Sequence, residues 1–363
     1  MRIPVDASRP LHEEPGTGHN RWSPDLDPIA SVAPGTELTL ETRDGLDGQL
    51  GRGSGSDDVV RLSLGRGHPL TGPVAVEGAE PGDLLVVDLL GYETADVGVT
   101  AIVPGFGFLA DLFPDPYVAV WEIAGGLARS EALPGVAVPA APFAGVVGVA
   151  PSPAFVERVR ARERALRARG GPVADDSPET AVPASAAGGL RTIPPRESGG
   201  NLDVPQLGAG SRLLLPVQVP GALFSIGDLH FAQGEGEVCG TGIEVAGAVT
   251  VRLGLEKQPA WVPRFPVYET PARPGRRVFA TTGIPLRDDG ANEALDVGLA
   301  ARRALLEMIG YLTDARGLGR EQAYVLASVA VDLRLSEVVD VPNALVSALL
   351  PLDVFERRAG RGP

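Results

Sequence analysis

The sequence predicts a mainly β protein with helices on its outside. Short apolar and β-branched runs follow one another along the 363-residue chain. Turn residues separate these runs, since 47 glycines and 34 prolines are spread through it without a collagen period. Hydrophobic residues make up 44% of the chain, enough for a substantial core. Only three windows carry apolar residues at helical spacing, so strands should dominate the fold.

The predicted strands are segments in which apolar residues alternate with polar ones or form short runs. Residues 38–42 alternate and then reach Asp44 and Gly45, a pair typical of a tight turn. Other stretches are apolar and punctuated by glycine and proline. We therefore expect strands within residues 38–42, 72–93, 145–152, 211–231 and 242–255.

Three segments are predicted to be helices: residues 154–169, 292–313 and 319–330. The first carries six arginines, with Glu163 and Arg167 at i,i+4 spacing. An arginine-rich helix can contact nucleic acid. A solvated helix face is the simpler interpretation, because acids outnumber bases over the whole chain.

We expect a single domain over residues 1–363, with a flexible insertion at about 152–190. Residues 171–190 contain almost only small residues, proline and acids, which is typical of a flexible surface segment. Strands are predicted on both sides of it, so it does not mark a domain boundary. Since it has little apolar material to bury, removing part of it should change stability little.

Composition narrows the choice of partner and compartment. The formal net charge is −14, and the acids are scattered. Such a surface repels nucleic acid and anionic membranes and favours a small neutral or cationic ligand. No run approaches the roughly 18 to 20 apolar residues of a membrane span, and the N-terminal segment lacks the apolar region of a secretory signal. A single cysteine excludes an intramolecular disulfide, so a cytoplasmic location is expected.

The stretch GDLHF at 227–231 carries one of only four histidines. In an extended strand Asp228 and His230 project to the same face, roughly 7 Å apart, so both can reach one metal ion. The glycine-rich turn that follows can bring back three more polar side chains, those of Gln233, Glu235 and Glu237. A lone Asp-x-His pair is more often a buried hydrogen bond than a set of metal ligands, so this motif alone leaves both interpretations open.

Three other polar clusters have a similar character. His19 lies beside Asn20 in a loop-like segment, and Asp44 lies at a strand end. A double glycine is surrounded by three further polar residues, Glu197, Asn201 and Asp203. Each cluster also has a local interpretation as turn formers or a loop cap.

Cys239 offers a nucleophile, with His230 or Glu237 activating its thiol. It also lies at the start of an apolar strand, where cysteine is usually a small buried hydrophobe. We assign no role to His12 and His68, which lie in exposed-looking loops. The sequence contains no G-x-S-x-G motif and no nucleotide-binding glycine pattern.

Together these motifs resemble the acetamidase/formamidase family. The similarity is carried in order by HNRW at 19–22, ETRDGLDGQ at 41–49, PPRESGGNLD at 194–203, and the longer stretches 216–244 and 328–355. The resemblance implies hydrolysis of short aliphatic amides, such as formamide and acetamide, to the carboxylate and ammonia. It also implies a jelly-roll-like β-barrel or sandwich, a homo-oligomer, and a divalent metal with zinc as first candidate. The segment 152–190 resembles the longer, formamidase-like branch.

With this resemblance, the site hypothesis becomes specific. We expect Asp44, Asp228 and His230 to hold the metal, with His19 as a fourth ligand or a substrate contact. A metal ion can activate water and polarise the amide carbonyl. His230 would thus act either as a ligand or as a proton carrier.

Proton transfer and substrate binding complete the hypothesis. A buried carboxyl group with a raised pKa, Glu237 or Glu197, would move the proton from water to the leaving nitrogen. Asn201 and Gln233 would contact the amide. The pocket should be small and mostly apolar, because few polar contacts must give all the selectivity.

Two other functions remain open from the sequence. One is a metal-free amidase that uses Cys239. The other is a non-catalytic β-barrel that binds a small polar ligand. A related urea or carbamoyl substrate is also compatible with the motifs.

Overall fold

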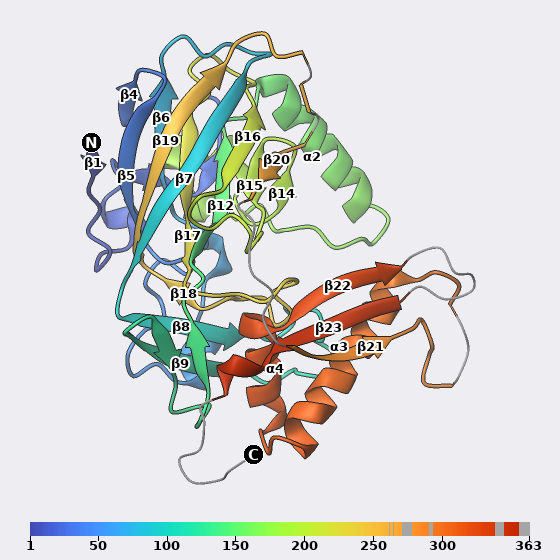
Figure 1. The fold of residues 1–363 in the computed structure, drawn as a ribbon. Helices are drawn as coiled ribbons and strands as arrows, with labels where there is room; N and C mark the ends of the chain where they lie inside the picture. The colour runs from blue at the N-terminus through green and yellow to red at the C-terminus, as the bar shows by residue number, and fades with distance from the viewer. Residues whose placement is uncertain (261, 264, 271–277, 290–292, 338–344, 356–363) are drawn as a thin grey trace.

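The structure is a computed structural model of the chain. The residues it describes are 1–260, 262–263, 265–270, 278–289, 293–337 and 345–355. Within these ranges the chain forms two large β-sheets, a small C-terminal sheet and four α-helices (Figure 1). None of the described helices has both the length and the apolar character needed to cross a bilayer.

The first large sheet contains the longest strands. Its order is β1 (Arg2–Ile3), β5 (Thr36–Thr42), β19 (Gly247–Glu256), β7 (Leu84–Thr94), β16 (Arg212–Pro216) and β20 (Val267–Glu269). The alternation expected at 38–42 is present, because Leu38 and Leu40 are buried whereas Glu37 is exposed. Successive side chains of a strand point to opposite faces, so this strand buries one face only.

The second large sheet is centred on β17 (Phe224–His230), whose residues are all buried. On one side of it lie β18 (Glu244–Val245), β8 (Val97–Ile102), β9 (Tyr117–Ala124), β10 (Leu127–Arg129) and β11 (Ala137–Pro139). On the other lie β12 (Phe143–Val149), β15 (Gly199–Asn201) and β14 (Pro195–Arg196). β17 also pairs with β6 (Leu70–Val76), which in turn pairs with β2 (Gly18–His19) and β4 (Ala30–Val32).

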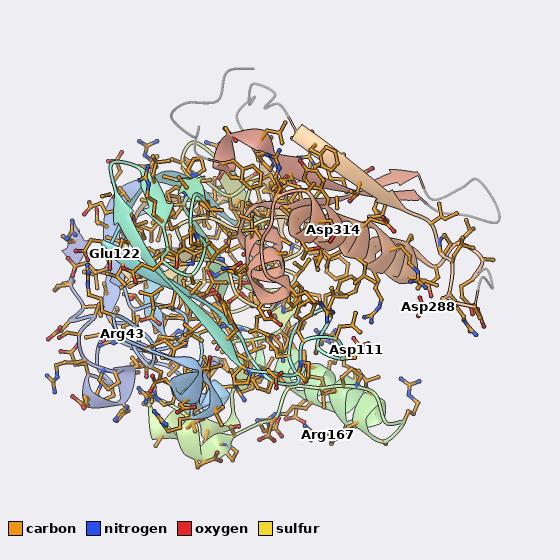
Figure 2. All side chains as sticks on the ribbon, turned by 90° about the horizontal axis from the view of Figure 1, so that it is seen from below. Arg43, Asp111, Glu122, Arg167, Asp288 and Asp314 are labelled. Carbon is orange, nitrogen blue, oxygen red and sulfur yellow. The ribbon has the colours of Figure 1, made fainter. Side chains whose placement is uncertain are left out.

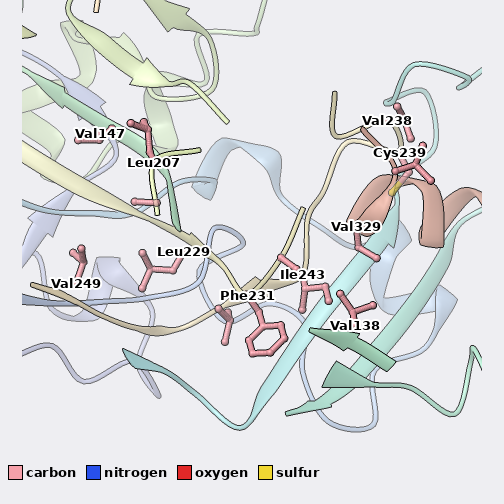
Figure 3. Packing of buried hydrophobic residues seen from close by; sticks show 14 of the residues in the cluster. Val138, Val147, Leu207, Leu229, Phe231, Val238, Cys239, Ile243, Val249 and Val329 are labelled. Atoms are coloured by element: carbon pink, nitrogen blue, oxygen red, sulfur yellow. The ribbon is translucent and has the colours of Figure 1, made fainter. Parts of the chain in front are cut away.

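The two large sheets pack against each other over an apolar core. β5 contacts β6 and β17, and β16 contacts β12. Figure 3 shows this contact at Val249 of β19 and Leu229 of β17, which belong to one buried cluster. The prediction of a mainly β fold with flanking helices is confirmed. In the strand order of the described residues neither sheet closes into a barrel, and the jelly-roll arrangement stays a prediction.

The C-terminal layer consists of helices packed on a small sheet. α3 (Val297–Asp314) contacts β21 (Val278–Gly283) and β23 (Leu345–Pro351), and β22 (Asp332–Glu337) pairs with β23. α4 (Arg320–Ala330) lies between α3 and β8 (Figure 1). Asp296 begins α3, because its side chain accepts a hydrogen bond from the Leu299 amide. The helices predicted at 292–313 and 319–330 are thus observed, and residue 292 lies outside the described residues.

The remaining elements are short, apart from α2. They are α1 (Ser56–Val60), β3 (Arg21–Trp22), β13 (Leu190–Arg191), and the 3₁₀ helices η1 (Leu11–Glu13), η2 (Leu64–Arg66), η3 (Pro178–Thr180), η4 (Ala184–Gly188) and η5 (Leu352–Val354). Charged side chains such as Glu122, Arg167 and Asp288 lie on the outside of the molecule (Figure 2).

The arginine-rich helix is α2 (Pro153–Arg167), and Ser152 is its N-cap residue. Its apolar face, Phe155 and Val159, packs with Trp22 of β3 and Leu190 of β13 in a small separate cluster. Most of its arginines are exposed, as the solvated-face interpretation predicts.

The segment after α2 is held by polar contacts that its composition does not reveal. Arg21 is fully buried, and its guanidinium donates to the carbonyls of Asp176 (3.3 Å) and Ser177 (2.6 Å) and to the Thr180 hydroxyl (3.0 Å). The Asn20 side chain accepts from the Val182 amide. These contacts satisfy a buried charge, so the segment takes part in the packing although it buries little apolar surface. The single-domain interpretation with a flexible insertion stays a prediction.

Deleting residues 174–180 is therefore expected to lower the free energy of unfolding by about 3 kcal/mol or more. The deletion leaves the buried guanidinium of Arg21 without three of its acceptors. Urea unfolding of the variant and wild type measures this difference. Deleting the exposed Arg169 and Gly170 is the control. A loss no larger than the control's would restore the expectation drawn from composition.

Candidate active site

Strand pairing brings the polar residues of β17 to those of its neighbours. His230 at the end of β17 lies opposite Glu244 of β18. Asp228 lies on the same strand, and the turn after it returns Glu237 to the same place. On the other side, β15 ends at Asn201 and the chain continues to Asp203. The second sheet thus gathers these side chains at one point.

The distances to the His230 imidazole define the centre of the site. Its Nε2 atom lies 3.0 Å from Glu244 Oε1, 3.6 Å from Asp228 Oδ1 and 3.9 Å from Glu237 Oε1. Among the described residues, two sets of three groups have ligand atoms within 4.8 Å of one another, and both include His230. The sets are Asp228, His230 and Glu244, and Asp203, His230 and Glu237.

The proton on His230 is fixed by Gln233. The Gln233 amide nitrogen donates to the Asp203 carbonyl (3.1 Å), an acceptor only, so its Oε1 faces His230 Nδ1 at 2.6 Å. His230 Nδ1 must then donate its proton to Oε1. Nε2 therefore faces the carboxylates: it donates its proton to Glu244 when the ring is charged, and it offers the lone pair that can bind metal when the ring is neutral.

Burial and mutual repulsion perturb these acids. Burial raises the pKa of Glu244 to about 8, and the charge of Asp228 adds to the effect. Burial and the charge of Asp203 raise the pKa of Glu237 well above its ordinary value. Asp203 is raised to a pKa of about 6, again chiefly by burial. A cation would offset this excess of buried negative charge.

The charges of the site also act on its two innermost groups. Burial disfavours both ions, but the charges of His68 and His230 hold the pKa of Asp228 below its ordinary value. For His230 burial is outweighed by Glu244 and Asp228, which raise its pKa well above the ordinary value.

Two glycines make room for the carboxylates. A Cβ on Gly145 of β12 would lie 2.5 Å from Asp203 Oδ1 and 2.6 Å from Asp228 Oδ2. A Cβ on Gly45 would lie even closer to Asp228 Oδ1, and 2.7 Å from Glu244 Oε2. Asp228 Oδ1 is itself buried without a hydrogen-bond partner among the described residues. An unpartnered buried oxygen beside an imidazole nitrogen fits a divalent cation bound by oxygen and nitrogen ligands.

Backbone strain is concentrated at the same place. Four non-glycine residues of the site have left-handed backbone conformations, with φ values between 43° and 56°: His68, Asp203, Asp228 and Glu237. Such conformations are unfavourable for residues with a Cβ atom and collect at functional sites.

A cavity of about 70 Å³ opens onto this cluster. Its polar lining includes His68, Asn201, Asp228, Glu237 and Glu244. The Asn201 side-chain oxygen is buried without a partner among the described residues. This volume exceeds the roughly 10–15 Å³ that one water molecule needs, so the cavity can hold a small molecule.

Three residues predicted for the site have their hydrogen bonds and ion pairs outside the cluster around His230. They are Asp44, Glu197 and His19. Both Asp44 carboxylate oxygens accept backbone hydrogen bonds, from Leu46 and Gly48 at 2.9 Å each, and Asp44 belongs to neither set of possible ligands. Glu197 forms a bidentate ion pair with Arg162 of α2 (2.6 and 2.9 Å). Backbone amides thus bind the carboxylate of Asp44, and Arg162 binds that of Glu197, in place of the contacts predicted for the site.

His19 also differs from its predicted place. It is buried, its Nε2 atom lies 2.7 Å from the Ser225 hydroxyl, and its ring meets Trp22 edge-on. His19 does not line the cavity. The structure therefore brings together Asp228, His230, Gln233, Glu237 and Asn201 of the predicted set, and not Asp44, Glu197 or His19.

Cys239 has the environment of a core residue. It is fully buried beside Val238 and close to α4 (Figure 3). Its thiol lies 3.6 Å from the Ala101 carbonyl, and burial raises its pKa to about 11. A thiol that stays protonated is a poor nucleophile, so this environment does not support the cysteine mechanism.

The sequence analysis missed Glu244, Asp203 and His68 as site residues. A signal existed for Glu244, because it stands between Ile243 and Val245 in an apolar strand, where a carboxylate needs a partner. Asp203 was part of a recognised cluster without an assigned role. His68 gave no signal, since nothing in a short glycine-flanked loop indicates that it lines a cavity.

Comparisons with known proteins show the family to which the chain belongs. The profile of the Acetamidase/Formamidase family matches residues 4–357. The formamidase of Methylophilus methylotrophus is 36% identical over 383 aligned residues, covering 98% of this chain and 93% of the relative. The acetamidase of Mycolicibacterium smegmatis is 37% identical over 364 aligned residues, covering 89% and 87%.

A solved structure shares the whole fold. The gamma lactamase from Delftia acidovorans superposes with a TM-score of 0.93 at 36% identity, covering 100% of this chain and 95% of that chain. The chain belongs to the acetamidase/formamidase family, as the sequence motifs predict.

The pKa of His19 gives a test of its assignment outside the site. Burial lowers this pKa from 6.5 to about 4, so the folded protein keeps His19 neutral where the unfolded chain would protonate it. This stability is complete above about pH 6.5 and is lost as the pH falls towards 4. Between pH 7 and pH 5 the wild type should lose about 2 kcal/mol more unfolding free energy than His19→Gln.

Urea unfolding at a series of pH values measures this difference. His12→Gln, at an exposed histidine, is the matched control and should run parallel to the wild type. If His19→Gln also runs parallel, the pKa of His19 is not lowered in the folded protein, which would contradict its burial as a neutral ring.

Proposed function

We propose that this protein is an amidohydrolase that cleaves small linear amides, such as formamide and acetamide, to the carboxylate and ammonia. The observation that carries the proposal is the cavity of about 70 Å³, which is lined by Asp228, Glu237 and Glu244, three of the four acids gathered around the His230 imidazole. Amide hydrolysis needs an activated water and a proton for the leaving nitrogen. Family membership and the names of the formamidase and acetamidase relatives support the same reaction.

The proposed cation site consists of Asp228, His230 and Glu244. Its donors are one imidazole nitrogen and two carboxylates, a set that suits zinc and related divalent metals. When bound, such a cation would polarise the amide carbonyl and lower the pKa of water. Gln233 orients His230 for this role through the hydrogen bond at Nδ1. Asp44 is not proposed as a ligand, because it belongs to neither group of residues whose ligand atoms lie within 4.8 Å of one another.

Glu237 is proposed as the group that moves the proton. It lines the cavity, lies 3.9 Å from His230 Nε2, and has a pKa raised by burial and by Asp203. A carboxyl group tuned in this way can take a proton from the attacking water and deliver it to the departing nitrogen near neutral pH. Asn201 offers its side-chain oxygen to the amide N–H of the substrate.

Cyclic amides are a second candidate substrate class. The likeness to the Delftia lactamase favours them, since ring opening of a lactam breaks the same carbon–nitrogen bond. The cavity volume favours the linear amides, because a lactam ring is larger than acetamide.

From the family resemblance we also propose a homo-oligomer located in the cytoplasm, and light scattering of the purified protein tests the oligomer.

Ammonia release from formamide and acetamide by the purified protein tests the activity. In this assay Glu237→Gln should lower kcat by about 100-fold or more, since it removes the proton carrier and keeps the shape. Glu235→Gln is the control, because Glu235 lies on the same turn but contacts Gln206 and Arg334 instead of the cavity. Equal rates for both variants would remove Glu237 from the mechanism.

Gly145→Ala tests the cation site with a second readout. The added methyl group would overlap the carboxylates of Asp203 and Asp228 and move them. We expect less bound metal by elemental analysis and about 100-fold lower activity, the scale of a misplacement of about 1 Å. Gly91→Ala in β7 is the control, since its Cβ would meet nothing within 4 Å. Unchanged metal content in Gly145→Ala would contradict the assignment of the ligands.

A further inference from the structure

The lining of the cavity is partly polar and partly apolar. Asp228, Glu237 and Glu244 contribute carboxylates, and the apolar wall is formed by Leu46, Leu64, Val103, Phe106 and Ile193. An amide bond placed at the carboxylates leaves its acyl group to contact this apolar wall. The size of the acyl group that fits is therefore decided by this wall.

Phe106 is the aromatic residue of the wall, and 43% of its surface is exposed. Its ring packs on the bare backbone of Gly240, where a Cβ atom would lie 2.5 Å from the ring carbon Cδ1. Gly240 has φ +98°, a conformation that favours glycine. The absence of a side chain at 240 thus lets the ring lie against the turn that carries Glu237.

The loop that carries Phe106 is fixed at its backbone. The Phe106 amide donates to the Val103 carbonyl (3.0 Å), and the Phe108 amide donates to the Val238 carbonyl (2.8 Å). The buried Tyr324 hydroxyl of α4 accepts from the Leu109 amide (2.8 Å) and donates to the Val238 carbonyl. These bonds tie the loop to the 238–240 turn, so Phe106 is a wall of defined position.

We propose that Phe106 is the residue that sets the upper size of the acyl group, and that it separates small linear amides from longer and cyclic ones. The inference rests on the proposed function. When a substrate carries one extra methylene group that must enter a packed apolar pocket, kcat/KM falls by about 10- to 200-fold. A shorter side chain at 106 leaves room for a longer acyl group. A larger side chain leaves less room for the acyl group beside the reacting carbonyl.

The experiment compares kcat/KM for formamide, acetamide, butyramide and 2-pyrrolidinone. Linear amides are followed by ammonia, and the lactam by the primary amine that ring opening releases. In Phe106→Ala the ratio of butyramide to acetamide should rise by about tenfold or more, and the ratio for the lactam should rise with it. In Phe106→Trp the ratio of acetamide to formamide should fall.

Phe108→Ala is the matched control. Phe108 stands on the same loop with 41% of its surface exposed but does not line the cavity, so its substrate profile should equal that of the wild type. An unchanged profile in Phe106→Ala, or a wild type that prefers the lactam, would overturn the role of Phe106 alone. A wild type that cleaves none of the four amides would instead overturn the proposed function, and this inference with it.

Discussion

The structure of the site depends on one constraint, the burial of several carboxyl groups around a single imidazole. Asp228 and Glu244 are almost fully buried, and Asp203 and Glu237 lie beside them. Isolated buried carboxylates are strongly unfavourable, so they must share protons, bind a cation, or both. The hydrogen bond from His230 Nδ1 to Gln233 directs the other ring nitrogen into this cluster. Without it, the imidazole would have no fixed orientation towards the acids.

The fold accommodates the cluster by removing side chains around it. β12 places Gly145 against the carboxylates, and the turn after β5 places Gly45 there. The strain at Asp228 is held by the strands on either side, since β17 pairs with three neighbours. A rigid sheet interior can therefore maintain a polar arrangement that a loop could not.

Much of the fold could be predicted from the sequence. Alternation at 38–42 and 242–255 and the helical spacing at 292–313 all reflect local periodicity, which a strand or helix imposes wherever it lies. The strand order could not be predicted, because pairing of β17 with β6, β12 and β18 joins residues far apart in the chain. The anchoring of residues 176–182 by Asn20 and Arg21 is non-local in the same sense.

The candidate site also has a part that local sequence could predict and a part that depends on residues far apart in the chain. Asp228 and His230 were found because they lie two residues apart on one strand, and Glu237 because a glycine-rich turn follows. Asp44, His19 and Glu197 were assigned on residue type, but each has a nearer partner: backbone amides, Ser225 and Arg162. His68 was missed because its role depends on a cavity, which is a property of the assembled sheet.

The bond between Tyr324 and the 103–109 loop links the apolar wall of the cavity to the C-terminal layer. α4 packs on α3 and β23, and its Tyr324 is hydrogen-bonded to the loop, so α4 connects the small sheet to that loop. Loosening of the small sheet would therefore reach the loop that carries Phe106. On the proposed role of Phe106, substrate discrimination would then depend on elements that do not line the cavity.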